Sequence, residues 1–183
     1  MIQRIDVMVD IETWGTKPDA VVRAVAAVAF APWTGDVFGT AVWDLRGLID
    51  RQLELGGTVD PDTVHWWGKL LNPLGDLIAD HEPPFVPEVL GDAAASLADF
   101  FMTHQPRCCW SRGAFDYPVL AQLMAKQDVV IPWQFWQLRD VRTLDDLVPK
   151  VKPDWPHHPL SDCLAQIEQV RAALALVPQP KAA

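Results

Sequence analysis

The sequence contains no long hydrophobic run, and this absence argues against a membrane protein. None of its apolar stretches approaches the roughly 18 residues that a membrane-spanning helix requires. The opening residues, MIQRID, also lack the basic region and the apolar block of a secretion signal. We therefore expect a soluble, cytoplasmic protein that has no membrane partner.

Cysteine is scarce, with three residues in a chain of 183. An odd number of cysteines, with Cys108 and Cys109 adjacent, does not suit a disulfide framework. The sequence also lacks a CxxC motif and a Cys/His zinc pattern. We expect the cysteines to behave as small, buried apolar side chains rather than as reactive groups.

Basic residues are outnumbered by acidic ones, 15 against 24, which gives a formal net charge of -9. This balance argues against a protein that coats nucleic acid through a broad basic face. It does not argue against an enzyme that holds only a short end of a strand. Cations bound by carboxylates can supply the positive field that a phosphate requires.

The length and the 50% hydrophobic content predict one domain, at residues 1–177, followed by a disordered tail at 178–183. Strands are predicted at the start of the chain and at residues 21–30 and 37–45, forming an antiparallel meander around the turn PWTGD. The many alanines of residues 20–31 are also compatible with a helix, but the four valines and the flanking turn signals favour a strand.

The rest of the chain predicts helices that alternate with short strands. Helices are expected at residues 60–71, 87–105, 115–127, 143–147 and 160–177, strands at 107–113 and 138–141, and an extended, proline-rich loop at 149–159. Three strands followed by alternating strands and helices predict an α/β fold with a mixed sheet flanked by helices.

Asp10 and Glu12 stand two positions apart at the end of the first predicted strand, VMVDIET. Because side chains alternate along a strand, both would project from one face, with Cα atoms roughly 6.5 Å apart. Two like charges so placed repel each other unless a cation lies between them. Alternatively, the strand has already ended and both acids are solvated. Ile11 would point to the opposite face, into the core.

Three further polar residues fall at positions that suit a catalytic site. Asp116 follows the short strand RCCWSRG at the start of a helix, and Asp162 lies in the first turn of the last helix. An acid there is often only a surface charge that the helix dipole favours. His157 lies in the loop five residues before Asp162, where it is either ordinary surface chemistry or a general base.

The order of these motifs, DxE in the first strand, FD in mid-chain and HxxxxD near the end, resembles that of the DEDDh exonucleases. The segments DIETWG, AVAFAPWTGDV, TVHWW, WSRGAFDYPVL, RDVRTLDDL and HHPLSD are similar to those of small phage and bacterial exonucleases related to phage exonuclease A and to a mycobacterial exoribonuclease. The resemblance extends over residues 5–170.

This resemblance implies an RNase H-like α/β fold with a mixed central sheet, antiparallel in its first three strands and parallel afterwards. It also implies two divalent ions, Mg²⁺ or Mn²⁺, roughly 4 Å apart. Asp10 would bridge both ions, Glu12 and Asp162 would complete the protein ligands of the first, and Asp116 would hold the second. His157 would deprotonate the attacking water, so that nucleoside 5′-monophosphates are released from a 3′ end.

The implied partner is single-stranded RNA or DNA, with RNA favoured by the resemblance. A homodimer and a monomer are both compatible with it. The family spacing of four residues before the final aspartate selects His157 as the base, because His158 leaves only three. The residues expected to contact substrate are Thr13, Trp14, Trp66 and Arg112.

The two tryptophans of this set are candidates for stacking on a base. Trp14 follows the DIET segment, and Trp66 lies on the helix that borders the substrate groove in the family. One stacked base is worth roughly 1 to 3 kcal/mol without sequence preference. Packing alone is the alternative for both, and Trp43 and Trp110 are expected to be buried strand residues.

Other functions fit parts of the pattern. One is a DNA-directed 3′–5′ exonuclease of phage or prophage origin, and another is a nucleic-acid-binding adaptor of the same fold that has lost turnover. The complete set of four carboxylates and a histidine opposes the adaptor. A glycoside hydrolase could use Asp10 and Glu12 as its acid pair, but it would leave the other acids and HHPLSD unexplained.

Overall fold

The structure is a computed structural model that describes residues 4–74 and 85–177, so the tail expected at 178–183 lies outside the described residues. The elements in chain order are β1 (Asp6–Thr13), β2 (Val22–Phe30), β3 (Val37–Asp44), η1 (Arg46–Leu48), α1 (Ile49–Glu54), α2 (Pro61–Leu74), α3 (Leu90–His104), β4 (Cys109–Ser111), α4 (Asp116–Ala125), η2 (Phe135–Gln137), β5 (Leu138–Asp140), η3 (Val141–Leu144) and α5 (Pro159–Leu174).

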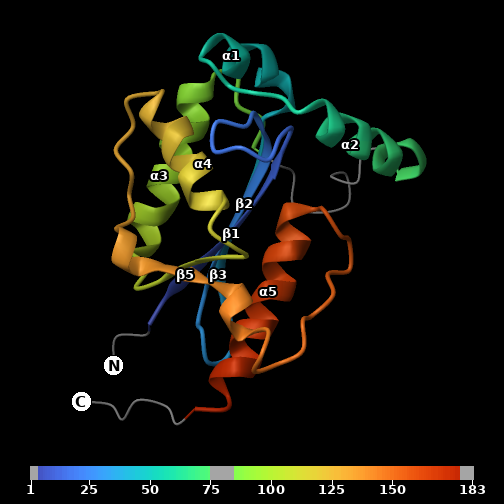
Figure 1. Ribbon diagram of the computed structural model, residues 1–183. Helices are drawn as coiled ribbons and strands as arrows, with labels where there is room; N and C mark the ends of the chain where they lie inside the picture. Colours follow the sequence, from blue (N-terminus) through green and yellow to red (C-terminus); the bar gives the residue numbers. More distant parts are fainter. Residues whose placement is uncertain (1–3, 75–84, 178–183) are drawn as a thin grey trace.

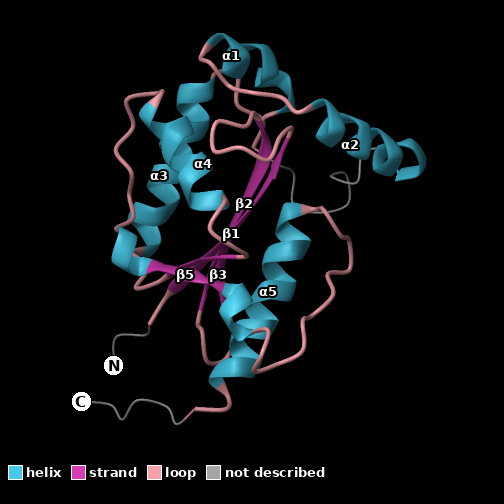
Figure 2. Ribbon diagram, viewed as in Figure 1, coloured by secondary structure: helices cyan, strands magenta, loops and turns pink. Residues whose placement is uncertain are grey.

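The strands form one mixed sheet in the order β3-β2-β1-β4-β5. β1, β2 and β3 pair antiparallel, whereas β4 pairs parallel with β1 and β5 parallel with β4. Helices α3 and α4 cover one face of this sheet and α5 covers the other (Figures 1 and 2). The predicted fold class is confirmed, including the strand, rather than a helix, at residues 22–30.

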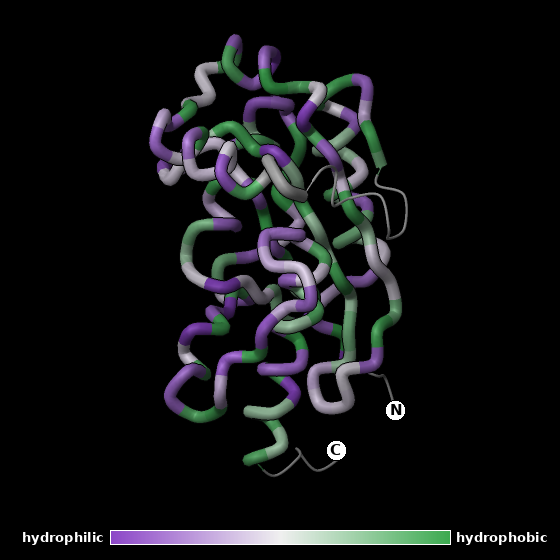
Figure 3. The backbone as a smooth tube through the Cα atoms, turned by 90° about the vertical axis from the view of Figure 1, so that its right-hand side faces the viewer, coloured by the Kyte–Doolittle hydropathy of each residue, from purple (hydrophilic) through white to green (hydrophobic). Residues whose placement is uncertain are grey.

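Alternation along β1 divides the hydrophobic core into two layers. Val7, Val9 and Ile11 belong to the layer beneath α3 and α4, which confirms the expectation for Ile11. Met8 belongs to the layer between the sheet and α5. The central strands are mostly hydrophobic along their length, while many of the outer turns are hydrophilic (Figure 3). Both faces of β1 therefore lie under helices, and its residues are buried except for Asp10, which is half-buried.

Several predicted boundaries extend too far, among them the ends of the helices expected at 115–127 and 160–177, which lie at Ala125 and Leu174. The helix expected from residue 87 begins at Leu90, because Val89 is still extended, with φ -132° and ψ 149°. The strand expected at 107–113 is limited to the three residues of β4. Gly113 ends it with φ +108°, a left-handed conformation that favours glycine, and accepts a hydrogen bond from Ser111 Oγ at its carbonyl oxygen.

The prediction of a helix at residues 143–147 is wrong. The chain instead forms the short 3-10 helix η3, which begins two residues earlier. The Asp140 side chain caps it by accepting a hydrogen bond from the backbone N–H of Arg142 at 2.8 Å. An aspartate side chain can start a turn by accepting hydrogen bonds from the backbone N–H groups that follow it. Here such an N–H group, that of Arg142, lies directly after β5.

The sequence patterns did not predict the two short helices η1 and α1 that follow β3. They pack through Gln52, whose amide donates to the carbonyl oxygen of Val22 and accepts from its N–H, both at 2.8 Å. This side chain supplies the hydrogen bonds that a neighbouring strand would otherwise make at the start of β2.

Other expectations about burial are confirmed. Cys108, Cys109 and Cys163 are free and buried, and Trp43 and Trp110 are 2% and 7% exposed. Within the described ranges, no helix is both long enough and apolar enough to cross a bilayer.

Phe101 on α3 offers a test of the packing on this face. It is 2% exposed and its ring lies 5.1 Å from that of Trp133, centroid to centroid. We expect Phe101→Ala to lower the free energy of unfolding by about 3 to 5 kcal/mol, since it leaves a cavity. The neighbouring Met102 is 66% exposed, and Met102→Ala should change it by less than about 0.5 kcal/mol. Urea denaturation measures the free energy of unfolding of both variants. Equal losses would contradict the placement of Phe101 in the core and of Met102 on the surface.

Candidate active site

Strand β1 carries Asp10 and Glu12 on the face that α5 covers. They continue the alternation of Met8, which lies in the core beneath α5. The strand extends to Thr13, so it has not ended where the acids occur. Across the sheet, Asp10 pairs with Ala26 and Glu12 with a second alanine. These small neighbours leave space above the strand for the two carboxylates.

The first turn of α5 places Asp162 above β1. Pro159 occupies the first turn, and His158 is the N-cap residue, whose Nδ1 accepts a hydrogen bond from the N–H of Ser161 at 3.4 Å. Asp162 Oδ2 accepts a hydrogen bond from the backbone N–H of His157 at 2.9 Å. The start of the helix therefore fixes both the acid and the loop residue that precedes it.

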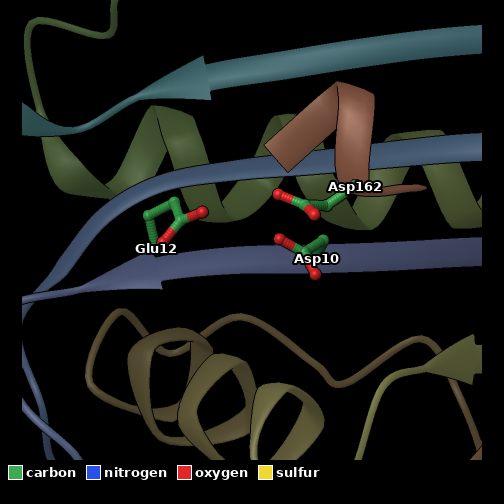
Figure 4. A group of neighbouring side chains, drawn as sticks. All are labelled: Asp10, Glu12 and Asp162. Atoms are coloured by element: carbon green, nitrogen blue, oxygen red, sulfur yellow. The ribbon is translucent and has the colours of Figure 1, made fainter. Parts of the chain in front are cut away.

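Asp10, Glu12 and Asp162 form a compact group of carboxylates. One oxygen atom from each lies within 4.8 Å of the other two. Asp162 approaches from α5 toward the Asp10 carboxylate, and Glu12 lies beside them on β1 (Figure 4). Carboxylate oxygens are the ligands that Mg²⁺ and Mn²⁺ prefer, and this spacing suits a shared divalent ion. The three side chains therefore fit a metal centre.

Asp116 joins this group from the opposite helix layer. It begins α4, directly after the loop that follows β4, and its side chain is buried. Its Oδ1 accepts a hydrogen bond from the backbone N–H of Ile11 at 3.1 Å, which ties α4 to the strand between the two acids. All four predicted carboxylates thus converge on the end of β1.

Burial raises the pKa of all four predicted carboxyl groups, and repulsion from neighbouring carboxylates raises it further at Asp10 and Glu12. Burial is the main cause for Asp10, whose pKa lies well above its ordinary range, and Asp116 and Glu12 add to it. Burial likewise raises the pKa of Glu12, against the opposing effect of Arg23, and the pKa of Asp162. The pKa of Asp116 is raised by burial to about 7. A bound cation would remove this unfavourable interaction.

The carboxylates lie at the base of an open groove of about 760 Å³. Its wall combines acids, aromatic rings, two arginines and small polar residues, which suits an extended ligand better than an enclosed small molecule. The lining residues are Asp10, Ile11, Glu12, Thr13, Gly15, Thr16, Asp60, Asp62, Thr63, Trp66, Trp67, Arg112, Phe115, Asp116, Arg142, His157, Asp162 and Gln166.

The two adjacent histidines occupy different environments. His157 is exposed, lines the groove and has φ +65°. Its ring lies edge-to-face with Trp66, at 4.7 Å between centroids, and 6.1 Å from Trp67. His158 is 2% exposed and serves as the helix cap. Only His157 therefore presents its imidazole to the groove.

The tryptophans form a layered wall beside the acids. Trp67 is buried and its indole N–H donates to the carbonyl oxygen of Thr13 at 2.9 Å, while Trp66 is 40% exposed. Trp14 is half-buried and packs edge-on against Trp67 at 6.3 Å, and it is not part of the groove lining formed by the described residues. The guanidinium of Arg23 lies over Trp67 at 4.3 Å. Trp66, rather than Trp14, therefore offers an aromatic face to a ligand.

Arg112 and Thr13 line the groove, but their side chains already form hydrogen bonds within the protein. Arg112 donates to both carboxylate oxygens of Asp145, at 3.0 and 2.8 Å, and to Gln169 Oε1 at 3.1 Å. Thr13 Oγ1 donates to the carbonyl oxygen of Gly15 at 2.6 Å. The contacts of both residues with substrate stay predictions, and the arginine would have to share its charge with Asp145.

Two polar residues that act on the predicted carboxylates were not themselves predicted. Gln166 lines the groove and its Nε2 donates to Asp10 Oδ1 at 2.9 Å. It follows Asp162 by four residues, a spacing that places both on one helix face and could have indicated it. Arg23 is 7% exposed and lowers the pKa of Glu12 by its charge. Its position within a Val/Ala-rich strand is the only signal the sequence holds.

Comparisons with known proteins support the fold. The zinc-bound form of the E. coli ExoI–ssDNA complex matches with a TM-score of 0.63 at 16% identity, covering 94% of this chain and 41% of that one. The chain thus spans less than half of that protein, and the likeness shows the RNase H-like fold. No curated protein matches the sequence.

A family model covers nearly the whole chain. Residues 5–174 match the 3′–5′ exoribonuclease Rv2179c-like domain. This range contains the DIE segment of β1, the start of α4 and the first turn of α5, which together carry the four carboxylates. The chain therefore belongs to the Rv2179c-like 3′–5′ exoribonuclease domain family.

Proposed function

We propose that this protein is a divalent-metal-dependent 3′–5′ exonuclease that acts on single-stranded nucleic acid, with RNA preferred to DNA. The observation that carries the proposal is the convergence of the Asp10, Glu12 and Asp162 oxygens within 4.8 Å at the base of an open groove. The preference for RNA rests on the family description. The structural relative is a complex with single-stranded DNA, which supports the single-stranded substrate class.

The four carboxylates would hold two divalent ions, with Asp10 shared between them, Glu12 and Asp162 on one ion and Asp116 on the other. Bound ions would supply the positive charge that activates water and stabilises the leaving 3′ oxygen. Because the chain carries an overall charge of -9, such a local source of positive field favours contact with phosphate. Arg142, which lines the groove and lowers the pKa of Asp116, adds to that field.

His157 is the general base of the proposed reaction. It accepts the proton of the attacking water, the water oxygen bonds to phosphorus, and the bond from phosphorus to the 3′ oxygen breaks to release a nucleoside 5′-monophosphate. The hydrogen bond to Asp162 holds the backbone of this residue, and the edge-to-face contact with Trp66 orients its ring. Because the His157 imidazole is exposed and lines the groove, it can approach a water molecule above the carboxylates without a rearrangement of the fold.

Trp66 is the proposed platform for a base near the 3′ end. It is 40% exposed, lines the groove and packs against Trp67 at 4.9 Å between ring centroids. Trp67 in turn is held by its hydrogen bond to the carbonyl oxygen of Thr13. Stacking on such a supported ring does not discriminate among bases, which suits an enzyme that advances along any sequence.

Oligonucleotides labelled at one end test the activity. With Mn²⁺, 5′-labelled single-stranded RNA should give a stepwise ladder that shortens from its 3′ end, and 3′-labelled RNA should release labelled mononucleotide. Chelator and Asp10→Asn should each abolish both products, and DNA assayed in parallel measures the preference. Cleavage that persists with chelator would contradict the proposal.

The paired histidines test the assignment of the base. His157→Ala should lower kcat by about 10² to 10⁴ fold, the usual contribution of a general base. His158→Ala should retain turnover but lose about 1 kcal/mol of stability, because it removes the N-cap of α5. Single-turnover rates and thermal denaturation measure the two effects, and the reverse pattern in turnover would overturn the assignment.

The raised pKa of Asp116 makes a prediction about stability and pH. The unfolded carboxyl group titrates near 3.8 and the folded one at about 7, so the folded protein holds a proton that the unfolded chain releases. Metal-free protein should therefore lose stability as pH rises from 5 to about 7.5. Asp116→Asn should flatten this loss, and saturating Mn²⁺ should cancel it in the wild type. Melting temperatures recorded across this pH range measure the effect. Equal changes of melting temperature with pH in the metal-free wild type and in Asp116→Asn would refute the prediction.

A further inference from the structure

Gln166 is a buried amide that is only half satisfied. It lies on α5, is 6% exposed and lines the groove. Its Nε2 donates to Asp10 Oδ1 at 2.9 Å, but its Oε1 is buried and has no hydrogen-bond partner among the residues that the structure describes. A buried amide oxygen is unfavourable without a donor, so this atom indicates a ligand or water of the groove.

The orientation of the amide follows from the chemistry of Asp10. In a cation-bound site Asp10 is ionised, and an ionised carboxylate accepts hydrogen bonds and cannot donate them, so the amide presents its NH₂ group to Asp10. The carbonyl end of the same amide then points away from Asp10. Turning the amide over would place two acceptors together and would leave the NH₂ group without its carboxylate partner.

Gln169, three residues further along α5, shows what a purely structural amide looks like in this helix. It is 1% exposed. Its Nε2 donates to Asp145 Oδ1 at 2.7 Å and its Oε1 accepts from Arg112 at 3.1 Å, so both ends have partners in the protein. Gln166 has a similar burial and the same helix, yet only its donor end is used.

We propose that Gln166 is a positioning residue of the cation site, an inference that rests on the proposed function. Its Nε2 fixes the rotation of the Asp10 carboxylate, the group assigned to both ions. Its Oε1 accepts a hydrogen bond from a water molecule that accompanies a divalent ion. Polar groups of this kind behind a metal ligand typically change metal affinity by about 10 to 100 fold when they are removed.

The test replaces each glutamine by methionine, which keeps chain length and apolar burial but removes the amide. Q166M should bind Mn²⁺ about 10 to 100 fold more weakly than the wild type by isothermal titration calorimetry. Its turnover should recover as Mn²⁺ is raised, with the KM for RNA unchanged. The matched variant Q169M should lose stability but keep the Mn²⁺ affinity of the wild type.

A measurement on the wild type covers the case in which Q166M does not fold. The side-chain NH₂ resonances of Gln166 should shift in a Mg²⁺ titration with the midpoint found by calorimetry, whereas those of Gln169 should not move. Unshifted Gln166 resonances, or Mn²⁺ affinity in Q166M equal to that of the wild type, would overturn this inference and leave the proposed function standing. A wild type that binds neither ion would overturn the proposed function and this inference with it.

Discussion

Repulsion among the closely spaced carboxylates of Asp10, Glu12, Asp116 and Asp162 is the constraint on which the site depends. Pairing with β2 and the apolar side chains on the other face of β1 hold Asp10 and Glu12 in place. The hydrogen bond from Ile11 holds Asp116, and the start of α5 holds Asp162. The hydrogen bonds to Asp116 and Asp162 lower the pKa of each acid, but burial still raises both above their ordinary value. The free energy of folding the core therefore maintains an arrangement of charges that is stable only with protons or cations.

Local patterns predicted most of the fold, and the order of the motifs, which resembles that of a known family, selected the acids of the site. The alternation of Ile11 between Asp10 and Glu12 predicted that Ile11 lies in the core and that the two acids share the opposite face, because strand periodicity is local. The start of η3 depended on Asp140 and on N–H groups that became available only after β5 had paired. A three-residue strand such as β4 likewise owes its limits to its neighbours rather than to its own sequence.

The polar partners of the groove were harder to predict because they are distant in sequence. Arg112 and Asp145 are separated by 33 residues, and Gln166 and Asp10 by 156. The sequence around Arg112 and around Gln166 contains no local feature that indicates which distant residue each will contact. Arg112 was expected to contact substrate through its positive charge. In the structure this charge is paired with the Asp145 carboxylate at 2.8 Å.

The alanines of β2 set the distance between the sheet and α5. Ala26 is fully buried opposite Asp10, and its carbonyl oxygen lies 3.8 Å from the Sγ atom of Cys163, the residue that follows Asp162. A branched side chain at position 26 would have to displace α5 outward, and Asp162 would move with it. A residue that carries no charge of its own thus helps to set the spacing of the carboxylates, and added side-chain volume there would change the geometry that they offer to a cation.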